Sequence, residues 1–364
     1  MRDDGVRPDV DVDVLVVGAG QAGLGTGYWL ARSTSTSFLI IDGADHLGDS
    51  WRRRWDSLAL FTPRRFSSLP GAPLPRGDVE YPTKDEMADY LRWYAERESL
   101  PVRLQTRVLA LTRDGDGFAA TTTTGRIRAR YVVLTPGPYS APFVPEAAAG
   151  LDPSVAQLHS SAYCSPGDLA GQDVLVVGAG NSAAQLAVEL SATRHVTVAA
   201  PGGMWFLPAR VLGISLYWWL WLSGILNGRS STWISRTVRA RGNGIIGKDL
   251  QALVAAGRVR MVEQRVVGGR GRAVLLADGT EVETDAVLWC TGYRPDHDWL
   301  HVAGVLDEQG APVHVGGRSP VPGLQWVGQP WQTRLNSGII DGVDRDARAA
   351  VRRIAADEAA DRTG

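Results

Sequence analysis

Three glycines, Gly18, Gly20 and Gly23, follow an apolar run that starts at Val14, and an acid, Asp42, closes the next apolar run. In a strand–turn–helix–strand unit, the first glycine permits a tight turn, the second lets the backbone approach a pyrophosphate, and the third lets helix and strand pack closely. Free N–H groups at the helix start attract phosphates. A carboxylate about twenty residues further on accepts hydrogen bonds from a ribose 2′-OH. We therefore predict a dinucleotide site, although glycine-rich turns also occur as plain chain reversals.

The same pattern returns about 160 positions later. Residues 173–183 read DVLVVGAGNSA, which predicts a strand and a turn at Gly178 and Gly180, followed by a helix over 184–190 and a strand over 195–199. Two such units indicate two dinucleotides held by two modules. A flavin bound permanently by the first module and a nicotinamide cofactor visiting the second is the simplest interpretation. Because hydride must pass between them, we expect the two sites to face each other across a cleft.

Other elements must position these turns. We expect a loop over 48–63, a helix from a capping box at Thr83 to about Arg97, short antiparallel strands over 107–111, 117–123 and 127–134, a strand over 283–289, and a closing helix over 338–356. The proline-rich residues 135–142 cannot continue a helix or a strand, so a domain crossing is expected shortly after them.

The predicted fold class is α/β, with two Rossmann-like dinucleotide-binding domains arranged as in glutathione reductase. The NAD(P)H-binding domain, residues 151–284, is expected to be inserted into a discontinuous FAD-binding domain formed by residues 1–150 and 285–364. A chain of 364 residues is long enough for two such cores.

Composition narrows the function classes. The chain is 44% hydrophobic and 21% charged, with a net charge of −1 and no long basic block, so we expect no nucleic-acid partner. Its two cysteines, Cys164 and Cys290, lie far apart, which argues against a dithiol reductase, a zinc site and a secreted disulfide framework. This cysteine usage and the polar N-terminus fit a reducing cytoplasm.

The longest apolar run covers residues 211–226. It falls short of the roughly 20 residues that a bilayer span needs, so no transmembrane segment is expected. We predict a helix here that either covers the cleft or pairs with a second subunit in a homodimer. Its tryptophans, Trp218, Trp219 and Trp221, fit a core or a dimer interface better than a substrate cage.

Eight motifs occur in a fixed order along the chain: GAGQAG, GDSWRRRWDSLALFTP, SSLPG, YPTK, HSSAY, GAGNSA, CTGYRPD and PGLQWVG. Over nearly its whole length the chain resembles the flavin-containing monooxygenases, class B flavoprotein monooxygenases whose short bacterial members are related to the plant auxin-forming enzymes. The resemblance implies FAD in the first module and NADPH in the second. It also implies insertion of one oxygen atom of O2, through a flavin C4a-hydroperoxide, into a small or medium, largely apolar substrate.

The resemblance assigns site residues motif by motif. On the FAD side it places Gly18, Gly20, Gly23, Asp42, Ser50 and Trp51, with Val108 near the adenine and Gly137 near the pyrophosphate. On the nicotinamide side it places Gly178, Gly180, Asn181, Ser182 and Ala183. It places Thr291, Gly292 and Tyr293 at the domain junction, Gly328 at the cofactor, and Trp331 and Gln332 at the substrate. No catalytic side chain and no metal ligand set is predicted, because the cofactor carries the reactive oxygen.

Several positions depart from the family pattern. Phe61 stands where many members have an asparagine near the flavin N5. Only the second half of a signature survives, at His159 and Tyr163, and His159 fits a structural hinge residue as well as a catalytic one. Both cysteines are expected to be buried, unreactive thiols.

The loop after the strand over 195–199 offers neither an acid nor an arginine, where relatives carry an arginine for the 2′-phosphate of NADPH. Ala183 is the NADPH-like choice at the third glycine position, but an alanine there can be simple packing. We expect NADPH and NADH to differ by no more than about tenfold, unless Arg210 or Arg194 supplies a substitute clamp.

Two other functions remain open. The chain could be a flavin reductase or NAD(P)H oxidase that makes no oxygenated product. It could also be a flavin-binding protein without turnover of its own.

Overall fold

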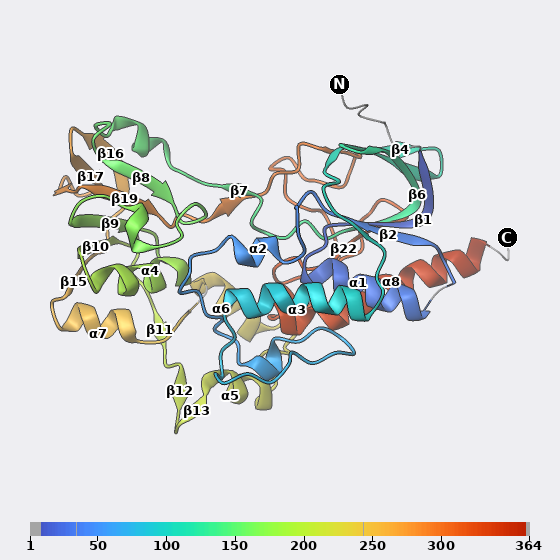
Figure 1. Cartoon of the computed structure of the whole chain (residues 1–364), viewed down its shortest axis with the longest axis horizontal. Helices are drawn as coiled ribbons and strands as arrows, with labels where there is room; N and C mark the ends of the chain where they lie inside the picture. The colour runs from blue at the N-terminus through green and yellow to red at the C-terminus, as the bar shows by residue number, and fades with distance from the viewer. Residues whose placement is uncertain (1–8, 34, 243, 362–364) are drawn as a thin grey trace.

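The computed structural model describes residues 9–33, 35–242 and 244–361. Figure 1 shows two sheets side by side, each with helices packed against it. Within the described residues, the first sheet has eight strands in the order β21 (Leu300–His301), β4 (Val108–Asp114), β5 (Gly117–Thr122), β6 (Gly125–Leu134), β1 (Val10–Val17), β2 (Phe38–Ile41) and β3 (Val102–Arg103), with β22 (Leu324–Trp326) paired to β6.

Strand β1 lies inside the first sheet because its second half, Val14 to Val17, is buried on both faces. It pairs in parallel with β2 on one side and with β6 on the other. Helices α1 (Gln21–Ser33), α3 (Lys84–Arg97) and α8 (Val343–Asp361) supply the apolar side chains of one core. Thr83 caps α3 with the predicted capping box. Its side chain accepts a hydrogen bond from Glu86 N–H, and the Glu86 side chain accepts one from Thr83 N–H.

The three antiparallel strands over 107–134 are confirmed, but they do not form a separate insert. β4, β5 and β6 pair antiparallel, and β6 continues alongside β1 from Ile127 to Leu134. Because β6 pairs with both β5 and β1, it joins the antiparallel strands β4–β6 to the parallel strands in one sheet.

The second sheet is parallel throughout. In the part of the chain that the structure describes, it has the order β15 (Val259–Val262), β10 (His195–Ala199), β9 (Asp173–Val177), β19 (Ala286–Trp289) and β8 (Ala156–His159). Helices α4 (Asn181–Ser191) and α7 (Asp249–Ala255) pack on one face. The antiparallel strands β16 (Val266–Arg270), β17 (Ala273–Leu276) and β18 (Glu281–Glu283), together with the 3-10 turn η2 (Glu146–Gly150), cover the other face.

Two connections between the sheets pair with each other. β7 (Ala141–Pro142) runs antiparallel to β20 (Tyr293–Arg294) between the two sheets (Figure 1). The predicted strand over 283–289 is wrong as a single element: β18 ends at Glu283 and β19 starts at Ala286. Asp285 causes the break, because its carboxylate accepts hydrogen bonds from the backbone N–H groups of Gln172 and Asp173. Since β19 belongs to the second sheet, the return crossing follows Trp289 rather than Thr284.

Residues 48–63 are not the plain loop that we expected. They begin with a helical turn, α2 (Asp49–Arg52), and bury Trp55 and Leu60. Trp55 packs into the core of the second sheet, whereas Leu60 packs into that of the first. Alternation of apolar and polar residues did not reveal this segment, because Trp55 and Leu60 pack into different cores.

The apolar run over 211–226 is not one helix. It contains the second strand of a hairpin, β12 (Arg210–Val211) and β13 (Ile214–Ser215), and then a short helix, α5 (Leu216–Leu222). Leu212 and Gly213 both have positive φ, so the chain reverses there instead of continuing helically. α6 (Trp233–Arg241) follows, and β11 (Phe206–Leu207) pairs with β14 (Ile245–Ile246). None of the helices in the described ranges is long and apolar enough to cross a membrane.

The short 3-10 turns are η1 (Arg64–Phe66), η3 (Pro166–Asp168) and η4 (Ile340–Gly342). Because η4 occupies the residues just before it, the closing helix α8 starts at Val343, five residues later than predicted. Its N-terminal end packs on α1, where a Cβ at Gly25 would lie 2.5 Å from Val343 Cγ1.

Candidate functional site

The first glycine turn joins β1 to α1, and each of its glycines has a different environment. Gly18 has a φ of +109°, and a Cβ there would lie 2.4 Å from Thr135 O. A Cβ at Gly23 would lie 1.8 Å from Gly18 O. A Cβ at Gly20, in contrast, would meet no heavy atom within 4 Å. The turn therefore needs Gly18 and Gly23 for its own packing, whereas Gly20 opens onto free space, as a phosphate-binding backbone requires.

Asp42 directly follows β2 and holds this turn in place. Its Oδ2 accepts a hydrogen bond from Ala19 N at 2.7 Å, and its Oδ1 accepts one from Ala44 N at 2.8 Å. A carboxylate has about four acceptor positions, so two remain for ribose hydroxyls. The acid thus has a structural role in addition to the predicted ribose contact.

Parallel strands place the other predicted FAD-side residues near this turn. β1, β6 and β22 run parallel, and their carboxyl ends are followed by Gly18, Gly137 and Gly328. A Cβ at Gly328 would lie 2.8 Å from Ala22 Cβ of α1, whereas Gly137 has a φ of +70° and open space around it. Ligands in open α/β folds bind at such carboxyl edges.

Three further predicted residues lie on neighbouring segments. Ser50 is exposed and Trp51 is half-buried in α2, which packs on α3. Val108 is buried at the start of β4, two residues after Thr106, whose N–H donates to Asp42 O. The structure therefore brings Val108 close to Asp42, the acid predicted to bind the ribose.

The second glycine turn joins β9 to α4 and repeats this geometry. Gly178 has a φ of +148°, and a Cβ there would lie 2.3 Å from Cys290 O, whereas a Cβ at Gly180 would meet nothing within 4 Å. Ala183 is fully buried in the core of this unit, and Ser182 is half-buried. The Asn181 side chain accepts a hydrogen bond from Ile246 N at 3.2 Å, which ties the helix start to β14.

The loop after β10 has an acid beside it rather than a cation. A Cβ at Gly203 would lie 3.0 Å from Glu263 Oε1. Glu263 follows β15, the neighbour of β10 in the sheet. Sequence reasoning missed this residue, although the parallel order of the two strands is the signal that could have indicated it.

Both arginines predicted as substitute clamps have other partners. Arg210 forms an ion pair with Glu80 and donates to Gly213 O at 2.9 Å. Arg194 donates to Gly171 O and to Pro166 O. Either side chain would have to leave these contacts to bind a 2′-phosphate, so binding of the 2′-phosphate by Arg210 or Arg194 stays a prediction.

Aromatic and polar side chains pack around the junction of the two sheets. The Arg54 guanidinium donates to the Tyr293 hydroxyl and lies 5.0 Å from the centroid of the Tyr139 ring. The Thr291 hydroxyl donates to Phe143 O across the crossing strands. Sequence reasoning placed Tyr293 here but missed Arg54 and Tyr139, which come from segments far away in the chain.

His159 is a structural residue of this junction. Its Nε2 lies 3.0 Å from Gly292 O, and its Nδ1 lies 2.8 Å from Ser161 Oγ and 3.1 Å from Ser161 N. The Ser161 N–H donates to Nδ1, so Nε2 carries the proton given to Gly292 O. Burial lowers the pKa of His159 and favours this neutral form. Tyr163, which follows it, is fully buried and donates to Glu189 Oε2 at 3.1 Å.

The two predicted substrate residues differ in their surroundings. The Gln332 side chain is engaged within its own loop: Nε2 donates to Trp326 O at 3.0 Å, and Oε1 accepts from Gln329 N at 3.2 Å. Trp331 has a φ of 61°, a conformation that bulky residues rarely adopt. Such strain is concentrated at functional sites, so Trp331 remains the better candidate for a substrate contact.

The two thiols are not alike. Burial raises the pKa of the Cys290 thiol to about 12, as expected for an unreactive cysteine. Cys164 is exposed, so the prediction that both are buried was wrong. The backbone of Cys164 stabilises the local structure, because Cys164 N donates a hydrogen bond to Asp168 Oδ2 and Cys164 O accepts one from Asp56 N.

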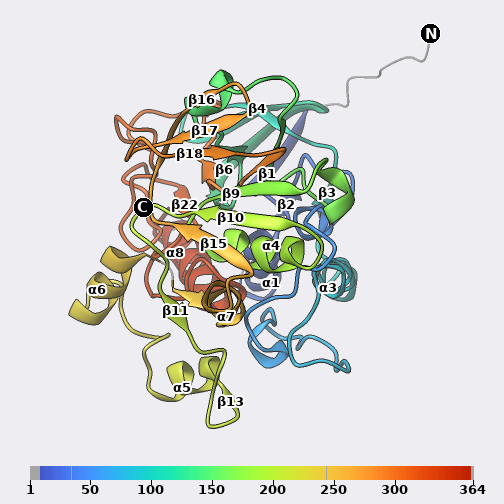
Figure 2. The same ribbon diagram turned by 90° about the vertical axis from the view of Figure 1, so that its left-hand side faces the viewer.

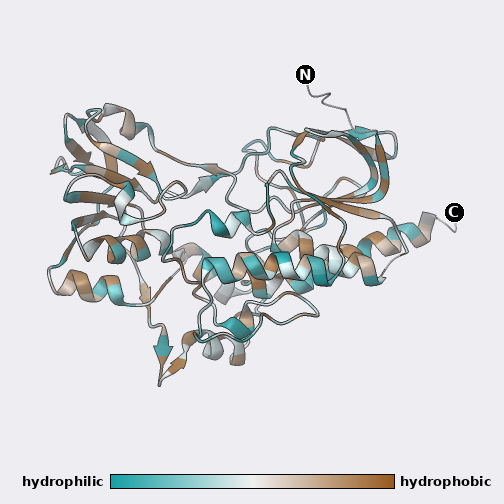
Figure 3. Cartoon of the chain, viewed as in Figure 1, coloured by the Kyte–Doolittle hydropathy of each residue, from teal (hydrophilic) through white to brown (hydrophobic). Residues whose placement is uncertain are grey.

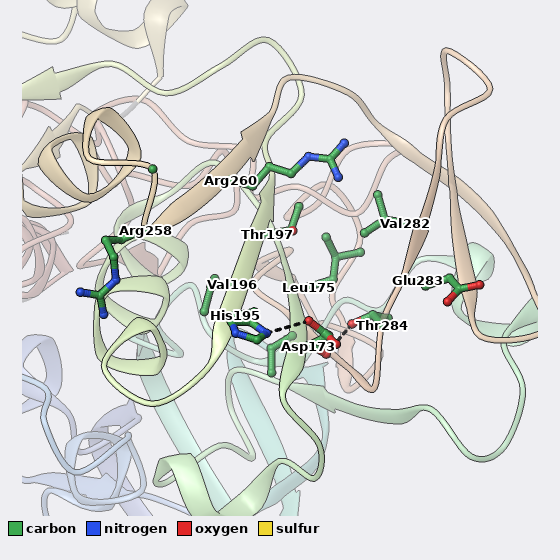
Figure 4. Close-up of a pocket in the computed structure, with 12 residues that line it drawn as sticks. Asp173, Leu175, His195, Val196, Thr197, Arg258, Arg260, Val282, Glu283 and Thr284 are labelled. Carbon is green, nitrogen blue, oxygen red and sulfur yellow. Dashed lines mark hydrogen bonds and ion pairs between the residues drawn. The ribbon is translucent and has the colours of Figure 1, made fainter.

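A hollow of about 220 Å³ lies at the edge of the second sheet where β9 and β10 begin (Figure 4). It is lined by Asp173 and His195, the first residues of β9 and β10, whose side chains are 3.2 Å apart. Nucleotides bind at the carboxyl ends of parallel strands, so this hollow is not the cofactor site. Across residues 9–33, 35–242 and 244–361, no group of three His, Cys, Asp or Glu side chains could hold a metal ion.

Comparison with known proteins agrees with this geometry. Residues 15–215 match the pyridine nucleotide-disulphide oxidoreductase family. An oxidoreductase named CzcO-like from Geobacillus kaustophilus is 41% identical over 94% of this chain and 98% of its own length. The indole-3-pyruvate monooxygenase YUCCA4 of rice is 29% identical over 95% of this chain and 89% of its own.

A solved structure shares the whole architecture. The flavin-containing monooxygenase of Stenotrophomonas maltophilia superposes with a TM-score of 0.80 at 30% identity, covering 95% of this chain and 99% of its own. The chain therefore belongs to the pyridine nucleotide-disulphide oxidoreductase family and is an oxidoreductase of the flavin-containing monooxygenase kind, with a flavin and a nicotinamide cofactor.

Proposed function

We propose that this protein is an FAD-dependent monooxygenase, driven by NADPH or NADH, that inserts one atom of O2 into a small or medium, largely apolar substrate. The observation that carries the proposal is the pair of glycine turns at the carboxyl edges of the two sheets. In each turn, the first glycine is required by packing and the second, Gly20 or Gly180, faces open space. Two such turns are better explained by two bound dinucleotides than by one bound cofactor at one turn and a simple chain reversal at the other.

FAD, rather than FMN, is the proposed flavin. Asp42 lies beside the first turn with acceptor positions left for an adenosine ribose, which FMN lacks. Asp42→Ala should weaken FAD retention by roughly 1.5–3 kcal/mol for each charge-assisted hydrogen bond lost. Chromatography of the flavin released from the purified protein checks this, and recovery of FMN alone would contradict it.

The proposed reaction consumes one NAD(P)H, one proton and one O2, and yields oxygenated substrate, water and NAD(P)⁺. The first glycine turn and Asp42 would hold the flavin, which would supply the reactive oxygen atom for transfer to a soft nucleophilic atom or a ketone carbonyl. The protein's own task is to hold both cofactors and to exclude water. We assign no general base, because His159 is already paired with Gly292 and Ser161.

An apolar cluster beside the Trp331 loop suits such a substrate. Phe66, Tyr217 and Leu226 are buried together, and Leu335 of the loop packs against them. The Tyr217 hydroxyl is buried and has no hydrogen-bond partner among the described residues. We propose that this hydroxyl orients the substrate. Tyr217→Phe should then raise the KM for substrate and leave flavin reduction by NAD(P)H unchanged.

Rapid mixing of the reduced protein with O2 tests the proposal directly. A transient C4a-hydroperoxide absorbance, with oxygenated product in proportion to NAD(P)H consumed, supports the monooxygenase. Release of hydrogen peroxide in equal amount to NAD(P)H, without a transient, would make it an NAD(P)H oxidase. A bound flavin that neither NADPH nor NADH bleaches would make it a flavin-binding protein without turnover.

A further inference from the structure

The hairpin β12–β13 and helix α5 expose an unusual set of apolar side chains. We define the α5 patch as Leu212, Ile214, Trp219, Trp221 and Leu222, which are 87%, 47%, 38%, 41% and 66% exposed. Figures 1 and 2 show these elements at one end of the molecule, away from both sheets. In Figure 3, β13 has the hydrophobic colour at this end of the molecule.

The patch is mounted rigidly on the rest of the protein. On the inner side of α5, Tyr217 is 3% exposed and packs against Phe66 with a centroid distance of 4.9 Å. The Ser215 side chain accepts a hydrogen bond from Tyr217 N at 3.3 Å and caps the helix. Trp219 Nε1 donates to Val211 O at 3.1 Å, which joins the helix to the hairpin. Trp221 also contacts this cluster, with its ring centroid 6.0 Å from that of Phe66. Leu212, Ile214 and Leu222 are not part of the cluster, so their exposed side chains have no role in this core.

The charge of the surrounding segment is entirely of one sign. Residues 201–248 contain six basic residues and no Asp or Glu. Two acids from elsewhere in the chain contact this segment: Glu80 forms an ion pair with Arg210, and Glu263 lies beside Gly203. Arg236 and Arg239 of α6 are exposed and form no ion pair with any described residue. In Figure 2, α6 lies to one side of α5 and above it, and Trp233 at the start of α6 is 70% exposed.

We propose that the α5 patch binds the surface of an anionic lipid bilayer. Tryptophan is enriched at membrane–water interfaces, and leucine side chains at a hairpin tip can enter the boundary of the acyl chains. The unpaired arginines of the next helix, α6, are attracted to anionic headgroups. Since no helix in the described part of the chain can span a membrane, the contact is at the surface.

A second copy of the chain fits the patch less well. In a two-fold dimer the same surface meets itself, so the basic residues of one subunit would face those of the other. The segment over 201–248 has no acid with which to pair them. The proposal depends on this surface alone and not on the reaction proposed above.

Sedimentation of the flavin-loaded full-length protein with lipid vesicles tests the proposal. Binding is expected to vesicles of phosphatidylcholine that contain phosphatidylglycerol, and to be lost as salt rises, because the Debye length falls to about 3 Å at 1 M. Leu212→Ser with Leu222→Ser should weaken binding by about tenfold or more. Arg236→Gln and Arg239→Gln should each weaken it by about fivefold.

Matched controls separate the patch from general surface effects. Val315→Ser replaces an apolar side chain that is 86% exposed elsewhere, and Arg352→Gln removes an exposed arginine of α8, so neither should change vesicle binding. Flavin content and melting temperature report whether each variant is folded. Absence of the wild-type protein from the vesicle pellet would overturn the proposal. A dimer in solution that Leu222→Asp converts to a monomer would assign the patch to a second copy instead.

Discussion

Replacing Gly20 with alanine should leave the fold intact and remove the flavin. A Cβ at this position meets no heavy atom within 4 Å, and Gly20 is not among the described glycines with positive φ. The substitution therefore meets no protein atom, and reduced freedom of the unfolded chain should even stabilise the apoprotein by about 0.4–1 kcal/mol. The added methyl group instead occupies the space proposed for the pyrophosphate.

The size of the effect follows from the contacts that a pyrophosphate would make at this turn. Loss of two charge-assisted hydrogen bonds to backbone N–H groups costs about 1.5–3 kcal/mol each. The total of about 3–6 kcal/mol corresponds to roughly two to four orders of magnitude in Kd for FAD. The flavin-to-protein absorbance ratio after dialysis measures retention, and thermal unfolding of the apoprotein measures stability.

Two matched variants make this prediction specific. Gly23→Ala should unfold the turn itself, because its Cβ would lie 1.8 Å from Gly18 O and the backbone must move. Gly180→Ala should keep the flavin but raise the KM for the nicotinamide cofactor. Full flavin retention in Gly20→Ala, or a melting temperature as low as that of Gly23→Ala, would refute the assignment of Gly20 to the pyrophosphate.

NADPH and NADH should reduce the flavin with efficiencies within about tenfold, and Glu263→Gln should shift the preference towards NADPH, because that carboxylate lies beside the loop after β10. In anaerobic reduction titrations, an advantage of NADPH of about a hundredfold that disappears in Arg210→Ala would show that this arginine is the clamp. Because burial lowers the pKa of His159, the unfolded state binds more protons at low pH, so stability should fall as pH drops below about 6.5. His159→Asn should flatten this dependence in urea unfolding at pH 7 and pH 5, and equal slopes in both proteins would contradict it. A thiol reagent should label Cys164 and leave Cys290 unmodified in the native protein, and labelling that persists in Cys164→Ser would show that Cys290 is accessible.

The secondary structure was most predictable where the signal is local. The capping box at Thr83 predicted the start of α3 because both of its hydrogen bonds join residues three apart. The strand over 195–199 was predicted residue for residue, since a short apolar run between turn residues has few alternatives. Prediction failed over residues 211–226, where composition alone favoured a helix. Positive φ at Leu212 and Gly213 reverses the chain there.

The sequence by itself determined the two glycine turns and the acid after β2, because the conformation of such a turn depends on neighbouring residues. Only the tertiary structure showed why two of the glycines cannot be replaced: Thr135 lies against Gly18, and Cys290 lies against Gly178. Likewise, the approach of Glu263 to the loop after β10 results from the order of strands in a parallel sheet. These contacts join residues separated by about 60 to 120 positions, and a parallel sheet brings such residues together only through its crossover connections. Spacing along the chain could not predict them, because it specifies each strand but not the neighbour beside which that strand will lie.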